Sequence, residues 1–120
     1  MPLAAVLFLL AADWPQFLGP TRAGVYAGND IAAAFPASGP PIVWKKDVGE
    51  GFASPVVASG KVILFHRLSG REIIEALDAS TGKNVWSYEY PTNYRDDFGF
   101  DEGPRSAPVV ADGVVYTFGA

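Results

Sequence analysis

The sequence predicts an all-β chain of short antiparallel strands, and two local observations carry this prediction. From Ile42 onward, runs of β-branched and aromatic residues alternate with Gly, Asp and Asn, a pattern typical of many short strands. Two of the boundaries, Ser59-Gly60 and Asp112-Gly113, have the residue types of the two-residue turns that join antiparallel strands. Hydrophobic residues make up 49% of the chain and charged residues 18%, which is ordinary for a globular protein.

The first twelve residues form a separate segment. Leu3 to Ala12 is an uncharged apolar run with the length of a signal-peptide core and too short to cross a bilayer. We therefore interpret residues 1–12 as a signal peptide, expect no transmembrane segment and expect an exported, periplasmic protein. The alternatives are a misassigned start and a buried first strand, and cleavage of the leader stays open.

Residues 13–41 are predicted to be an extended, irregular lead-in, because Gly and Pro interrupt them too often for a long element. We expect this lead-in to pack on the rim of the fold. After it, strands are predicted at residues 42–48, 56–58, 61–66, 73–78, 84–90, 109–111 and 114–118.

The chain contains an internal repeat. Residues 52–66 align without gaps with residues 105–119 at an offset of 53 residues, and seven of the fifteen pairs are identical. Repeated strand-rich units are typical of a β-propeller or a β-solenoid, and propeller blades commonly span roughly 40 to 50 residues. The extra length falls in residues 91–104, which we interpret as a loop inserted between two blades.

After the first repeated hairpin, residues 76–86 read ALDASTGKNVW. The fixed positions of this stretch resemble the tryptophan-docking motif A-x-D-x-x-T-G-x-x-x-W of the quinoprotein-like (PQQ-binding-like) β-propeller repeat family. The residues that match are Ala76, Asp78, Thr81, Gly82 and Trp86. The lead-in sequence DWPQFLGPTRAGV is also similar to the start of exported bacterial proteins with these repeats. Trp44 precedes the first repeated hairpin as Trp86 precedes the second.

The resemblance implies four-stranded antiparallel blades, with Trp86 buried against a neighbouring blade. The predicted fold is thus a β-propeller fragment in residues 42–120, truncated within its second repeat, with residues 42–48 completing a blade whose other strands lie elsewhere. The remaining blades of a longer chain are the first expected partner.

Two kinds of protein share this fold: PQQ-dependent alcohol dehydrogenases and the propeller lipoprotein of the outer-membrane barrel-assembly machinery. We favour a binding or scaffolding role, with a protein or small molecule as ligand. The alternatives are the N-terminal part of a PQQ-dependent dehydrogenase and an outer-membrane assembly factor. We predict no cofactor in this chain, and the resemblance implies PQQ and calcium only if the full-length protein is a dehydrogenase.

Several function classes are disfavoured by composition. A formal net charge of -4 and nine scattered Lys and Arg residues argue against nucleic acid as a partner. With no Cys and one His, no catalytic triad can be assembled from spacing, and we predict no catalytic or metal-ligating residue. His66 is expected to be structural or on the surface.

The candidate binding residues are those at the start of each repeated hairpin. The first strand of a propeller blade lines the central channel, so Phe52, Ser54, Arg105 and Ser106 are predicted contacts at the channel mouth. In the inserted loop, the four acidic residues are expected to be solvated, with a calcium site as the alternative. Its aromatic residues are expected to cap a blade, with a recognition surface as the alternative.

Overall fold

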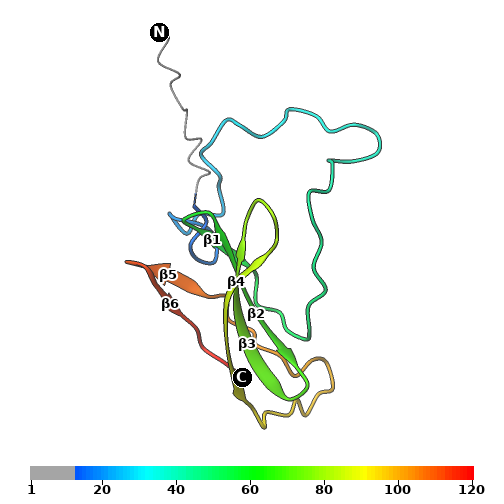
Figure 1. Cartoon of the computed structure of the whole chain (residues 1–120), viewed down its shortest axis with the longest axis vertical. Coiled ribbons are helices and arrows are strands. Elements are labelled where there is room, and N and C mark those ends of the chain that lie inside the picture. Colours follow the sequence, from blue (N-terminus) through cyan, green and yellow to red (C-terminus); the bar gives the residue numbers. More distant parts are fainter. Residues whose placement is uncertain (1–12) are drawn as a thin grey trace.

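The structure, a computed structural model, describes residues 13–120, and the predicted signal peptide lies outside the described residues. Its regular elements are antiparallel strands: β1 Val56–Ala58, β2 Lys61–Leu68, β3 Arg71–Asp78, β4 Asn84–Pro91, β5 Val109–Ala111 and β6 Val114–Tyr116 (Figure 1). The first four form one sheet in the order β1-β2-β3-β4, and β5 pairs with β6 in a second sheet. The all-β prediction is confirmed, with one four-stranded antiparallel unit and the beginning of another.

Both predicted hairpin turns are present. Ser59 and Gly60 join β1 to β2, and Asp112 and Gly113 join β5 to β6, with positive φ at all four residues. This conformation matches the twist of the flanking strands. Ser69-Gly70 makes the same kind of turn between β2 and β3, and the same residue types could have predicted it.

The hydrophobic core lies between the two sheets. One face of the four-stranded sheet supplies the buried cluster of Val56, Ile63, Phe65, Ile74 and Ala76. Side chains that flank or belong to β5 and β6 pack against this cluster, among them Ala107, Val110 and Val115. The second repeat therefore covers one face of the first, as neighbouring blades do.

One predicted strand is wrong. Residues 42–48 are extended but form no ladder, and Ile42 and Val43 are exposed. Their β-branched pattern favours a strand, but a strand also needs a pairing partner, and the described part of the chain offers none at this place. We call residues 42–50 the strap, because they cross the face of the sheet opposite the core cluster.

The lead-in begins at the edge of the first sheet. Trp14 pairs with Val57 of β1 through two backbone hydrogen bonds of 2.8 and 2.9 Å, and packing on a propeller rim stays a prediction. The next carbonyl, that of Pro15, accepts the N–H of Val110 in β5 at 2.8 Å. The free edges of β1 and β5 carry unpaired backbone groups, and the lead-in satisfies some of them.

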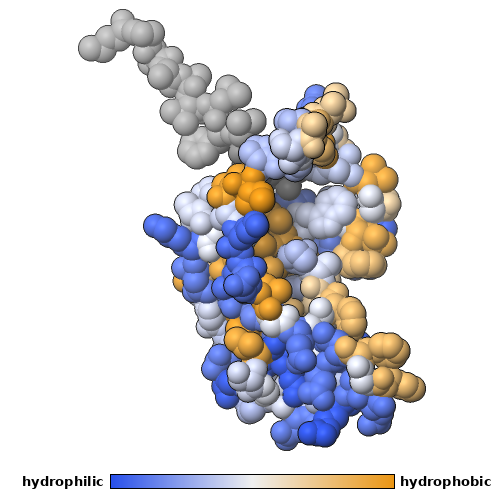
Figure 2. Space-filling view, turned by 90° about the vertical axis from the view of Figure 1, so that its right-hand side faces the viewer, coloured by the Kyte–Doolittle hydropathy of each residue, from blue (hydrophilic) through white to orange (hydrophobic). Residues whose placement is uncertain are grey.

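In residues 13–120, no helix is long and apolar enough to cross a membrane. Hydrophilic side chains gather at the lower end of the molecule, where the β2–β3 hairpin and the inserted loop lie (Figures 1 and 2).

Candidate functional site

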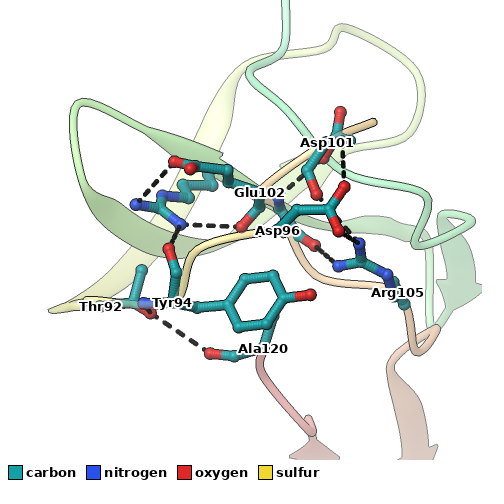
Figure 3. Close-up of polar contacts among 9 residues, drawn as sticks. Thr92, Tyr94, Asp96, Asp101, Glu102, Arg105 and Ala120 are labelled. Atoms are coloured by element: carbon teal, nitrogen blue, oxygen red, sulfur yellow. Dashed lines mark hydrogen bonds and ion pairs between the residues drawn. The ribbon is translucent and has the colours of Figure 1, made fainter. Parts of the chain in front are cut away.

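The inserted loop, residues 91–104, is tied to both repeats by two arginines. Arg67 of β2 is buried, donates hydrogen bonds to the carbonyls of Tyr94 and Glu102 at 2.8 and 2.9 Å, and pairs with the Glu102 carboxylate at 3.3 Å. Arg105 donates to the carbonyls of Asp101 and Gly103 at 3.0 and 3.2 Å (Figure 3). The loop is therefore a fixed structure between the repeats.

Asp96 organises the tip of this loop. Its side chain is only 4% exposed, and its carboxylate accepts the backbone N–H groups of Phe98, Phe100 and Asp101 at 3.3, 2.6 and 3.2 Å. The N–H of Phe100, with those of Asp101 and Phe98 and the charge of Arg105, holds the pKa of Asp96 below its ordinary value although burial opposes this. The expectation of a fully solvated acidic loop is thus wrong for Asp96.

The same contacts occupy the carboxylates that a calcium site in the loop would need. Asp96 faces backbone donors, Asp101 accepts the N–H of Gly103 at 2.7 Å, and Glu102 pairs with Arg67. Calcium needs six to eight oxygen ligands turned toward one point, and these carboxylates are turned toward different protein groups. Among residues 13–120, no three or more His, Cys, Asp or Glu side chains gather as a metal site would require.

The four residues predicted at the channel mouth lie around one cavity of about 350 Å³, lined by Phe17, Phe52, Ser54, Arg105, Ser106 and Ala107. We call this cavity the mouth pocket. Phe52 and Ser54 precede β1 whereas Arg105 and Ser106 precede β5, and the carbonyl of Pro104 joins the two segments by accepting the N–H groups of Phe52 and Ala53. Their place at a channel mouth stays a prediction.

Sequence reasoning missed Phe17, which reaches the pocket from the lead-in. No repeat or motif places this residue near the strand starts. Phe17 is brought there by the pairing of Trp14 with Val57, and backbone pairing of this kind leaves no signal in the sequence.

Arg105 is the charged residue among those that line the mouth pocket. Its guanidinium carbon lies 5.8 Å from the ring centre of Phe52 and 5.2 Å from that of Tyr94, within reach of cation–π attraction. The carboxylate of Asp96 lies 3.8 Å away, so the charge of the arginine is already balanced. The balanced charge favours contact of the guanidinium plane with flat apolar groups of a ligand over the binding of a free anion.

The docking-motif turn has the structure that its residues predict. The Asp78 carboxylate accepts hydrogen bonds from the hydroxyl and N–H groups of Ser80 and Thr81, at 2.5 to 3.1 Å. These bonds, that of the Ser80 hydroxyl first, hold the pKa of Asp78 below its ordinary value. Gly82 follows with φ +70°, and Ala76 lies buried in β3.

Trp44, rather than Trp86, contacts this turn. The indole N–H of Trp44 donates to the carbonyl of Ala79 at 2.9 Å, and its ring lies against Gly82. Trp86 is 37% exposed and lines a groove with Tyr88 and Tyr90 between β4 and β6. Docking of Trp86 against a further blade stays a prediction.

Comparison with known proteins finds one relevant similarity. The chain is 31% identical over 112 residues to the outer membrane protein assembly factor BamB of Xanthomonas campestris pv. campestris. The match covers 79% of this chain and 27% of that protein, so the chain spans about a quarter of the length of its relative. No protein-family profile matches the chain. No solved structure matches it either.

With the all-β fold, this similarity supports a repeat protein of the β-propeller type, similar in sequence to part of BamB.

Proposed function

We propose that this chain is part of an exported β-propeller repeat protein that binds other proteins at the mouth pocket and the inserted loop, in a scaffolding role on the periplasmic side of the outer membrane. The mouth pocket carries this proposal. It combines exposed Phe52 with Arg105 and the neighbouring ring of Tyr94, and aromatic residues and Arg are the types enriched where proteins bind one another.

The rigidity of the inserted loop supports the same function. Phe98 and Phe100 are 83% and 80% exposed, yet the backbone between them is fixed by Asp96. Side chains presented on a fixed backbone lose less freedom on binding, which favours recognition. The proposal requires neither a quinone nor calcium.

The proposal is tested by photo-crosslinking in the organism that carries the gene. A photoreactive phenylalanine analogue replaces Phe52 in the full-length protein, and in a control it replaces Phe35, which has similar exposure, 59% against 62%. We expect an adduct with another protein at position 52 and none at position 35, with a lower yield after Arg105→Ala. No adduct at position 52, or equal adducts at both positions, would contradict protein binding at the pocket.

The similarity to BamB favours a second candidate, a part in the assembly of outer membrane proteins. A strain that lacks the gene should then contain less outer membrane protein than its parent, and restoring the gene should reverse this. Unchanged outer membrane protein content would contradict the assembly role without affecting the crosslinking result.

A further inference from the structure

The strap is held on the sheet by a row of polar contacts. Lys46 pairs with the Glu75 carboxylate of β3 at 3.0 Å, the N–H of Gly49 donates to His66 of β2 at 3.0 Å, and Glu50 exchanges two backbone hydrogen bonds of 2.8 Å with Arg67. A side chain at Gly49 would clash with the Arg67 carbonyl. The strap therefore approaches β2 closely at the position where it meets His66.

His66 uses both of its ring nitrogens. The N–H of Gly49 donates to Nδ1, so Nδ1 carries no proton, and Nε2 lies 3.1 Å from the Glu75 carboxylate and donates its proton there. The His66 side chain is 8% exposed, so water cannot readily replace a lost partner. These contacts require the neutral imidazole.

Charged groups lie beside this histidine on two elements, Glu75 on β3 and Lys46 on the strap. Farther along the sheet, Glu89 on β4 is occupied by Arg71 at 2.8 Å. Burial alone would raise the pKa of Glu75, but hydrogen bonds from Lys46 and His66 outweigh burial and lower it. Glu75 is consequently ionised from neutral to mildly acidic pH.

We propose that His66 is an acid-sensitive latch for the strap, released when a proton from solvent binds Nδ1. The proton turns the acceptor of the Gly49 N–H into a donor, so two donors face each other and the strap loses this bond. The contact between Nε2 and Glu75 remains, because the carboxylate also pairs with imidazolium. The second positive charge beside Lys46 further weakens the attachment of the strap.

This inference does not depend on the proposed function, since it concerns the strap and not the mouth pocket. Imidazole is the side chain whose ordinary titration falls between about pH 5 and about pH 8. The strap also carries Trp44, whose indole lies on the docking-motif turn. Acidification should accordingly loosen the contact that holds residues 42–50 on this blade.

Hydrogen exchange of the full-length protein tests the latch, with rates corrected for the intrinsic effect of pH. We expect the protection of the Gly49 and Glu50 N–H groups to fall by roughly threefold to tenfold between pH 8 and pH 5, as for the loss of one hydrogen bond. Protection of the β2–β3 hairpin should stay constant. Strap protection independent of pH, or a parallel loss in the hairpin, would overturn the proposal.

Two variants sharpen the test. His66→Asn keeps an acceptor near the place of Nδ1 but does not titrate, so its strap should stay protected at pH 5. Glu75→Gln removes the charge that favours imidazolium, so release should require a lower pH. If His66→Asn does not fold, as judged by exchange in the hairpin, Glu75→Gln decides. Wild-type pH dependence in His66→Asn, or an unchanged release pH in Glu75→Gln, contradicts the latch.

Discussion

The contact between Trp44 and Gly82 depends on the absence of a side chain at residue 82. A Cβ at this position would lie 2.7 Å from the indole ring, closer than non-bonded carbons approach. Gly82 also has φ +70°, a conformation that costs other residues roughly 1–2 kcal/mol. One residue thus serves both the turn and the docking of the strap.

Gly82→Ala should destabilise the full-length protein more than Gly60→Ala. Both glycines have φ +70°, but nothing lies within 4 Å of a Cβ at Gly60, so Gly60→Ala measures backbone strain alone. The additional displacement of Trp44 should raise the cost at Gly82 by about 1–3 kcal/mol, the range for overpacking. Urea unfolding measures both free energies.

A double-mutant cycle attributes this excess to Trp44. In a Trp44→Ala background the ring is gone, so the two glycine substitutions should cost the same. An excess that persists without the indole would mean that Gly82 acts through its turn only.

Among the elements, the inserted loop owes its shape to Asp96. Three backbone N–H groups converge on this carboxylate, which lowers the pKa of Asp96. A lowered folded-state pKa gives a stabilisation that is fully present above the ordinary value of about 3.9 and is lost as pH falls through the folded-state pKa. Between pH 5 and pH 8 the loop should therefore not respond to pH, in contrast to the strap.

Asp96→Asn should loosen the loop at every pH in this range. The amide oxygen of Asn is a weaker hydrogen-bond acceptor than a carboxylate oxygen, and the amide nitrogen would place a second donor against one of the N–H groups. Hydrogen exchange of residues 98–101 should accelerate several-fold. Asp97→Asn removes the same charge from the exposed neighbour and should change little; equal acceleration in both variants would point to net charge instead.

The sequence predicted best the turns and strands whose conformation is determined by their own residues. Ser59-Gly60 and Asp112-Gly113 determine their turns through their own φ angles, and strands β1 and β5 were predicted with their observed bounds. Residues 42–48 have the same β-branched character, but a strand there needs a distant partner. The local residue pattern does not show whether such a partner strand is present.

The mouth pocket, too, could be predicted only in part from the sequence. The repeat predicted that Phe52, Ser54, Arg105 and Ser106 occupy related positions, and the structure brings them around one cavity. Tyr94 joins them through the fold of the inserted loop, which depends on hydrogen bonds of Arg67 and Asp96. Such bonds follow from the tertiary structure rather than from spacing.

At the scale of the whole molecule, the lead-in and a buried carboxylate also join the second repeat to the first. The lead-in bridges β1 and β5 through backbone hydrogen bonds of Trp14 and Pro15. At the other end, the buried carboxylate of Glu72 in β3 accepts the N–H of Ala120 at 2.8 Å and the hydroxyl of Tyr90. Burial, together with the bond to Glu72, raises the pKa of Tyr90. The repeats are thus joined at both ends of the interface.

Trp14→Ala should weaken the bridge made by the lead-in. The indole lies against Gly19, where a Cβ would approach it to 2.7 Å, and it is partly buried. Its loss should cost about 1–2 kcal/mol, less than for a fully buried large side chain, and limited proteolysis should cleave the lead-in faster. Ile31→Ala is the matched control, because Ile31 is 62% exposed in the same segment and should stay within about 0.5 kcal/mol. Equal cleavage in the two variants would show that the lead-in is held by its backbone alone, without help from the Trp14 side chain.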